Sequence, residues 1–125
     1  MLEVKPIDSS AAKKYCNTKK IEYINGTTTV ISAIEQGSTL GTLVYDIADN
    51  KMIIKFIEPT DDFILADGIF RSALFIAANK SIMDIYWQSP VPNDLINKLG
   101  FVKDEQEKSI DVTNLFSSCE SCKKS

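Results

Sequence analysis

Glu58 is the residue of this chain best placed for acid–base chemistry. It follows Met52–Ile57, a nearly continuous apolar run that is typical of a strand covered on both faces. Pro59 then ends the strand, because proline cannot donate to a strand ladder. The chain has no histidine, so proton transfer must use carboxylates, tyrosines, a cysteine, lysine or water. Glu58 is therefore either a general base where the sheet splays or a solvated acid beside a turn.

The segment after this strand has the features of an anion-binding helix start. Gly68 begins a stretch of helical period that reaches Lys80, and we predict the main helix over this stretch. A strand–helix–strand unit in an open sheet places its ligand near the helix N-terminus. Gly68 is either a phosphate-loop glycine or a plain helix-entry glycine, and Asp67 is most simply the N-cap of the helix.

A third group that could do chemistry is the cysteine pair near the C-terminus. Cys119 and Cys122 form a C-x-x-C pair followed by Lys123 and Lys124. Such a pair can supply half of a four-thiolate zinc site completed by a second chain, or a thiol–disulfide switch. A solvated tail with two reduced thiols is the third alternative. Cys16 is interpreted as a small apolar helix residue.

These residues need a sheet to position them, and the hydrophobic pattern predicts one. Thr27–Ile34, Leu43–Ile47 and Met52–Ile57 are strands separated by turn signals, which predicts an antiparallel meander. A strand at Met83–Trp87 follows the main helix and must lie parallel to Met52–Ile57 through a right-handed crossover. The sequence thus predicts an α/β fold with a mixed sheet, in which a meander precedes a parallel βαβ unit.

Shorter elements complete the expected domain. Leu2–Val4 is a weak first strand, and Asp8 caps a short helix that ends near Cys16. Ile21–Ile24 is a further extended segment. A short helix after Pro92 ends at Gly100, and Ser109–Leu115 is a last strand. We expect one domain over residues 1–116 and a tail over residues 117–125.

Composition narrows the function classes. The net charge is −3, and the lysines are scattered among acids, so no basic face for nucleic acid is visible. No apolar run has the length of a membrane span, and no signal segment is evident at Met1, which leads us to expect a cytoplasmic protein.

The order of these elements resembles the GNAT superfamily of acyl-CoA-dependent N-acetyltransferases over roughly residues 1–115. Ile57-Glu58-Pro59 is similar to the V-x-P end of the family's fourth strand, and Leu99-Gly100-Phe101 is similar to the K-L-G-F end of its last helix. The resemblance implies transfer of an acetyl group from acetyl-CoA to a small-molecule or peptide amine. The sequence also leaves a homodimer open.

The resemblance also implies roles for individual residues. Glu58 would deprotonate the amine, directly or through a water, and the backbone N–H near Ile57 would stabilise the oxyanion. Five residues would bind the cofactor: Ile57 at the end of the strand, together with Ala66, Asp67, Gly68 and Arg71, which overlay the family's phosphate-loop motif or the helix after it.

The sequence leaves a second class of function open. Phe63 stands where the motif has a polar side chain, and Ile96 stands where the family has a tyrosine that acts as general acid. Asp61, Asp62 and Asp67 surround the expected pyrophosphate position with negative charge. The alternative is therefore a degenerate GNAT-like module that binds a ligand or partner without catalysis. A redox- or metal-linked module that acts through the C-x-x-C tail is a third alternative.

Overall fold

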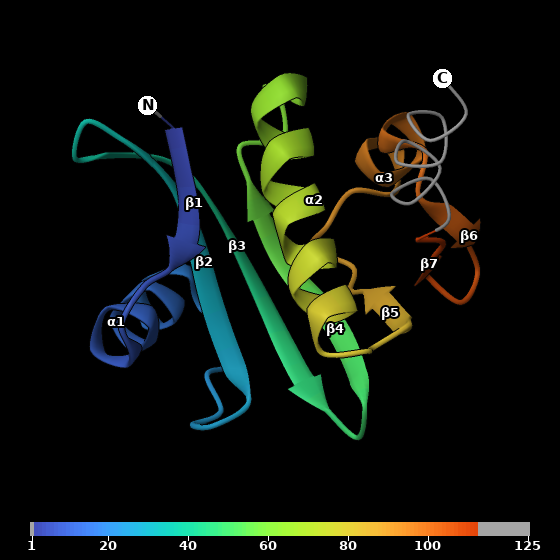
Figure 1. Ribbon diagram of the computed structural model, residues 1–125, viewed down its shortest axis with the longest axis horizontal. Helices are drawn as coiled ribbons and strands as arrows, with labels where there is room; N and C mark the ends of the chain where they lie inside the picture. The colour runs from blue at the N-terminus through green and yellow to red at the C-terminus, as the bar shows by residue number, and fades with distance from the viewer. Residues whose placement is uncertain (1, 113–125) are drawn as a thin grey trace.

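The structure, a computed structural model, describes residues 2–112 of the chain. Within these residues a seven-stranded sheet has the order β1-β2-β3-β4-β5-β7-β6 (Figure 1). The elements in chain order are β1 Leu2–Pro6, α1 Ser9–Lys19, β2 Thr28–Glu35, β3 Ser38–Ala48, β4 Lys51–Glu58, α2 Phe63–Asn79, β5 Asp84–Trp87, α3 Asn93–Leu99, β6 Val102–Asp104 and β7 Ser109–Ile110.

The predicted antiparallel meander is confirmed. β2 pairs with β3 and β3 pairs with β4, both antiparallel. The two-residue turns between these strands have positive φ angles. These are 51° and 81° at Gln36 and Gly37, and 53° and 60° at Asp49 and Asn50. Turns of this kind match the twist of the strands they join, and glycine, asparagine and aspartate tolerate such angles best.

The predicted parallel βαβ unit is also confirmed. β4 and β5 are parallel neighbours, with Lys51 opposite Asp84 and Ile54 opposite Trp87. The pairing ends there, although β4 continues to Glu58. Beyond Ile54, β4 therefore pairs with β3 alone among the described strands. The sheet opens on the β5 side of the last residues of β4, as the sequence predicts.

The predicted start of the main helix is wrong. α2 begins at Phe63, because the Asp62 side chain caps the helix by accepting a hydrogen bond of 3.1 Å from the Leu65 N–H. Gly68 lies in the second turn of α2, not at its entry. A glycine inside a helix lowers helix propensity without ending the helix. The predicted helix start at Gly68 therefore lies five residues after the observed start at Phe63.

Two helices cover opposite faces of the sheet. The buried face of α2, which includes Ile69, Phe70 and Leu74, packs with Leu43 and Ile54 of the sheet in the main core. The buried residues of α1, Ala12 and Cys16, pack with Val30 and Val44 in a smaller core. Side chains alternate along a strand, so neighbours such as Leu43 and Val44 point to different faces. Figure 1 shows α2 lying along one face of the sheet.

The remaining elements show where local pattern was insufficient. The last helix ends at Gly100 in the left-handed conformation, with φ of 82°, as predicted. Ile21–Ile24 is not a strand, and β6 was not predicted. The predicted last strand begins correctly at Ser109 but is described only to Ile110 as β7, and residues 113–115 lie outside the described part. None of the described helices is long and apolar enough to cross a membrane.

Candidate functional site

Glu58 lies at the centre of a polar cluster between β4 and α1. Its Oε1 accepts a hydrogen bond of 2.5 Å from the Tyr15 hydroxyl, and its Oε2 lies 3.3 Å from Nζ of Lys19. The side chains of Lys19 and Glu58 are 37% and 38% exposed, so a ligand from solvent can reach both. The structure thus brings a carboxylate, a phenol and a primary ammonium group together at the end of a sheet strand.

The local structure of α1 explains why Tyr15 and Lys19 meet Glu58. Asp8 caps the helix through a hydrogen bond of 2.9 Å from the Ala11 N–H, and Cys16 is fully buried against the sheet. Residues four apart share one side of a helix, so Tyr15 and Lys19 emerge together. The Tyr15 ring also contacts Phe56 edge-on, with ring centroids 6.4 Å apart, and Lys19 Nζ lies 5.9 Å from the Tyr15 ring centre.

Tyr15 acts as a hydrogen-bond donor in this cluster. Burial and then the hydrogen bond and negative charge of Glu58 raise the pKa of Tyr15 well above its ordinary value, an effect that Thr42 partly offsets. The phenol therefore keeps its proton at neutral pH and stabilises the Glu58 carboxylate. It holds one carboxylate oxygen and leaves the other for a cation.

A hollow of about 410 Å³ opens beside Glu58. Two of its hydroxyl groups, those of Ser32 and Thr42, are buried and lie 3.2 Å apart. Gly41 allows β3 to approach the end of β4, since a Cβ at this position would lie 2.9 Å from the carbonyl oxygen of Glu58. The lining residues are Tyr15, Ser32, Thr39, Leu40, Gly41, Thr42, Glu58 and Pro59.

A second hollow of about 700 Å³ adjoins the first and reaches the start of α2. The two hollows share Leu40 and Pro59. Apolar side chains are exposed along the second hollow, and Ile64 is 84% exposed. Its lining residues are Leu40, Pro59, Asp61, Asp62, Phe63, Ile64 and Leu65. We call the two hollows together the β4–α2 groove.

Solved structures of acetyltransferases share this architecture. The ribosomal-protein-S18-alanine N-acetyltransferase of Escherichia coli matches with a TM-score of 0.63 at 7% sequence identity, covering 83% of this chain and 79% of that chain. The IAA acetyltransferase of Bacillus cereus ATCC 14579 matches at 0.60 and 16% identity, covering 80% and 72%. The PaiA N-acetyltransferase of Thermoplasma acidophilum, solved with coenzyme A, matches at 0.54 and 9% identity, covering 88% and 96%.

The chain has the GNAT fold. The predicted resemblance is thereby confirmed for the fold. Similarity at these sequence identities shows the fold alone. No protein-family model matches the sequence, and no curated protein matches it either. Activity and ligand must therefore be argued from the residues of the site.

Four of the five residues predicted to bind the cofactor lie within α2, and the fifth, Ile57, lies in β4. Ala66 is fully buried, and its N–H donates to the Asp62 carbonyl oxygen at 2.9 Å. The Gly68 carbonyl accepts a hydrogen bond of 2.9 Å from the Ser72 hydroxyl. The sequence-based prediction that Asp67 is the N-cap is wrong. The Asp67 carboxylate instead accepts a hydrogen bond of 3.0 Å from Nε of Arg71. Only Ile57 and Glu58 of the predicted set lie together at the opening in the sheet.

The start of α2 does not suit a diphosphate. A helix N-terminus binds anions through N–H groups that lack an intrahelical partner. Here the Asp62 carboxylate already takes the Leu65 N–H, and Asp61 adds a second negative charge. Arg71 is held by Asp67 and lies over the Phe101 ring, 5.1 Å from its centre. No lysine or arginine lines the second hollow, so coenzyme A would meet the carboxylates of Asp61 and Asp62 there without a basic partner.

Sequence reasoning missed Tyr15 and Lys19. The available signal was their spacing of four residues in a helix, which places a phenol and an ammonium group on one side. Nothing in the sequence indicates which strand end this side faces. Ile96, at the position of the family's general acid, is fully buried in the main core and offers no polar group to the site.

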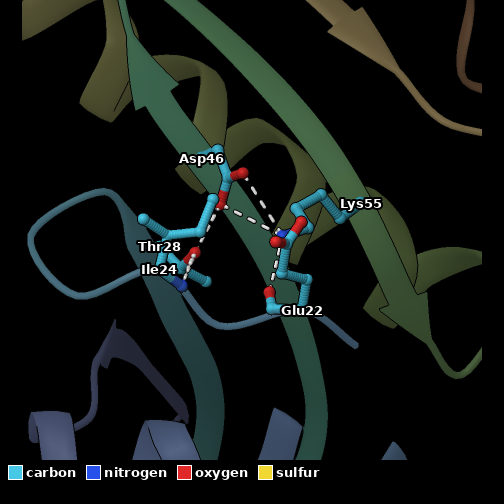
Figure 2. A network of polar contacts seen from close by, with 5 residues as sticks. All are labelled: Glu22, Ile24, Thr28, Asp46 and Lys55. Atoms are coloured by element: carbon cyan, nitrogen blue, oxygen red, sulfur yellow. Dashed lines mark hydrogen bonds and ion pairs between the residues drawn. The ribbon is translucent and has the colours of Figure 1, made fainter. Parts of the chain in front are cut away.

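Lys55 forms a separate buried polar network that holds the chain after α1 against the sheet (Figure 2). The Lys55 side chain is 6% exposed, and its Nζ donates to the Glu22 carbonyl oxygen at 2.6 Å and lies 3.2 Å from Oδ2 of Asp46. Oδ1 of Asp46 accepts from the Thr28 hydroxyl at 2.6 Å, and that hydroxyl accepts from the Ile24 N–H at 2.9 Å. Because its polar groups satisfy one another, this network is structural.

The cysteine predictions divide between described and undescribed residues. Cys16 is fully buried, and burial raises the pKa of its thiol, in agreement with an apolar helix residue. Cys119 and Cys122 lie outside the described residues, so zinc binding and disulfide formation by this pair stay predictions. Within residues 2–112 no group of three or more cysteine, aspartate or glutamate side chains could hold a metal ion.

Proposed function

We propose that this protein uses the GNAT fold to bind a primary amine at Glu58. The observation that supports the proposal is the contact between Nζ of Lys19 and Oε2 of Glu58 at 3.3 Å. A primary ammonium group of the chain itself occupies the place that a ligand's ammonium group would take. The site therefore has the charge and the access that an amine requires.

The surroundings of Glu58 favour exchange of Lys19 for a ligand. Exposed ion pairs contribute only about 0–1 kcal/mol, so a ligand amine can displace Lys19 at little cost. The Tyr15 hydroxyl keeps Glu58 oriented during the exchange, because it holds the other carboxylate oxygen. The Ser32 and Thr42 hydroxyls in the adjoining hollow offer further hydrogen bonds to a bound amine.

Binding of the amine does not require coenzyme A in this proposal. The acidic start of α2 disfavours the diphosphate, and the position of the family's general acid holds a buried isoleucine. These two features support the non-catalytic alternative that the sequence left open. We therefore place the protein among binding modules.

Titration calorimetry with n-pentylamine tests the proposal, with n-pentanol as the neutral control of the same length. We expect heat of binding with the amine and none with the alcohol. Glu58→Gln should abolish amine binding, and Lys19→Met should tighten it roughly threefold, because the competing ammonium group is removed. Equal responses to amine and alcohol, or unchanged amine binding by Glu58→Gln, would contradict the proposal.

The second candidate function is N-acetyl transfer from acetyl-CoA to a small-molecule or peptide amine. The opening in the sheet favours it, since Ile57 and Glu58 extend past the end of β5. Its test is release of free thiol from acetyl-CoA in the presence of n-pentylamine, together with a thermal shift by coenzyme A. Thiol release that depends on Glu58 would show that the protein is an enzyme and would contradict the proposed binding module.

A further inference from the structure

β1 is an edge strand of the sheet and pairs with β2 alone among the described strands (Figure 1). An edge strand presents unpaired N–H and C=O groups that a further strand can bind. Every residue of β1 except Val4 is exposed. None of them lines either hollow beside Glu58. The free side of β1 is therefore a surface that another chain can reach, separate from the proposed amine site.

The hydrogen bonds to β2 decide which backbone groups of β1 face the free side. The N–H of Ile7, directly after β1, donates to the carbonyl oxygen of Val30 at 3.0 Å. Hydrogen-bonded residues alternate along an antiparallel ladder, so the odd-numbered residues of β1 bond to β2 as Ile7 does. The backbone groups of Leu2, Val4 and Pro6 therefore point away from β2. Proline lacks an N–H, and it is tolerated where the N–H would face solvent.

The charges of β1 are complementary to those of a second β1. Glu3 and Lys5 lie on one face of the strand, and their side chains, 66% and 54% exposed, come within 3.6 Å. If two copies of β1 pair antiparallel with Val4 opposite Val4, each Glu3 faces the Lys5 of the other copy. A shift of two residues in either direction places Glu3 opposite Glu3 or Lys5 opposite Lys5. Facing opposite charges stabilise a strand pair and like charges destabilise it, so the charges select the first register.

The other face of β1 is apolar and also fits a second copy. Leu2 is 44% exposed, and a hollow of about 580 Å³ opens beside Val4 and Pro6, with Ile47 and Ile76 in its wall. Residues opposite each other in an antiparallel pair share a face, so Leu2 of one copy stands over Pro6 of the other in this register. Each Leu2 then covers the rim of the other copy's hollow, because a two-fold contact is made twice.

We propose that β1 pairs antiparallel with β1 of a second copy of this chain, around a two-fold axis at Val4. The two Val4 residues exchange both backbone hydrogen bonds, and each Leu2 N–H donates to the Pro6 carbonyl oxygen of the other copy. The Glu3–Lys5 pairs lie on one face and the Leu2–Pro6 contacts on the other, and the two sheets become continuous. A single short strand from each copy makes a small interface, so this dimer dissociates on dilution.

Sedimentation velocity over a range of protein concentrations tests the proposal. We expect the wild-type protein to pass from monomer to dimer as its concentration rises toward about 1 mM, since small interfaces are weak. Glu3→Lys and Lys5→Glu each place like charges opposite one another, and each should weaken dimerisation roughly tenfold. The two substitutions change the net charge in opposite directions, so net charge does not explain a loss in both. A wild-type protein that stays monomeric at every concentration would overturn the proposal.

Combinations of the two substitutions test the pairing of Glu3 with Lys5. The double variant Glu3→Lys, Lys5→Glu restores opposite charges and should dimerise like the wild-type protein. An equimolar mixture of the single variants should form a mixed dimer that is tighter than the dimer of either variant alone. Unchanged dimerisation in both single variants, or a mixture that associates no better than its components, would overturn the proposal in favour of another surface.

Cysteine substitutions test the register. Cys119→Ser and Cys122→Ser remove the cysteine pair near the C-terminus, and the remaining Cys16 is fully buried. In this background Val4→Cys places two thiols opposite each other, with Cα atoms about 5.5 Å apart, a separation that a disulfide can bridge. Mild oxidation should link this variant into a dimer, whereas Leu2→Cys, opposite Pro6, should link far less. A linked dimer from Leu2→Cys and none from Val4→Cys would overturn the proposal.

Discussion

The hydroxyl of Tyr15 donates a hydrogen bond of 2.5 Å to Oε1 of Glu58 and so joins the middle of α1 to the end of β4 across 43 residues of sequence. The bond keeps one carboxylate oxygen occupied and directs the other toward Lys19 and the solvent. The helix and the strand end are thereby linked in one contact beside the proposed amine site.

Tyr15→Phe should destabilise the protein by about 1 kcal/mol. Hydrogen bonds to charged groups contribute about 1.5–3 kcal/mol, and partial exposure of Glu58 reduces this value. Tyr23→Phe is the matched control, because no hydrogen bond of the Tyr23 hydroxyl to described residues is found, and it should change stability by less than about 0.5 kcal/mol. Urea unfolding at neutral pH measures both. Equal effects of the two substitutions would mean that the hydrogen bond between Tyr15 and Glu58 does not stabilise the protein.

Alkaline pH should destabilise the wild-type protein through the same residue. The pKa of Tyr15 is raised in the folded chain, and that of Tyr45 is raised by burial, whereas an unfolded tyrosine ionises near pH 10. The stabilisation is therefore complete below about pH 10 and is lost as the pH rises beyond it, because the unfolded chain releases protons that the folded chain retains.

Unfolding free energies measured below and above about pH 10 show whether stability falls as the pH rises. The loss on the alkaline side should be shallower in Tyr15→Phe, which lacks the group. It should also be shallower in Glu58→Gln, because removal of the carboxylate lowers the pKa of Tyr15 toward its ordinary value. A wild-type protein that gains stability above this pH would contradict the raised pKa of Tyr15 in the folded chain.

Local pattern predicted the elements better than the contacts between them. The meander and the parallel β4–β5 pair were predictable because strand alternation and helical period are local signals. The start of α2 was misplaced because Gly68 resembles a helix entry, whereas the Asp62 cap determines it. Tyr15 was missed because its contact with Glu58 depends on how buried Ala12 and Cys16 orient α1 over the sheet. That orientation is a tertiary property.

Two glycine substitutions should have opposite effects. Gly41→Ala would place its Cβ 2.6 Å from Cδ1 of Ile69 and 2.9 Å from the backbone oxygen of Glu58, and overpacking of this kind costs about 1–3 kcal/mol. Gly68→Ala meets no atom within 4 Å and lies inside α2, so it should stabilise the protein by roughly 0.5–1 kcal/mol. Thermal unfolding of both variants checks the prediction. Destabilisation by Gly68→Ala would mean that Gly68 is not an ordinary helix residue.

Lys55→Met should be among the most destabilising substitutions in the described part of the chain. It leaves Asp46, whose side chain is 15% exposed, without its cation, and it leaves the Glu22 carbonyl oxygen without its donor. Breaking a buried ion pair by removing one partner costs about 3–5 kcal/mol, because an uncompensated charge stays in a poorly solvated place. We expect a loss of about 3 kcal/mol in urea unfolding.

Two comparisons show whether this loss comes from the unpaired charge. The double variant Asp46→Asn, Lys55→Met removes both charges and should recover part of the stability, since an apolar or neutral pair avoids the desolvation of an unpaired ion. Lys5→Met breaks the exposed pair with Glu3, at 3.6 Å, and should cost less than about 1 kcal/mol. If the double variant is as unstable as Lys55→Met, the lost packing of the lysine stem explains the effect, and the ion pair does not.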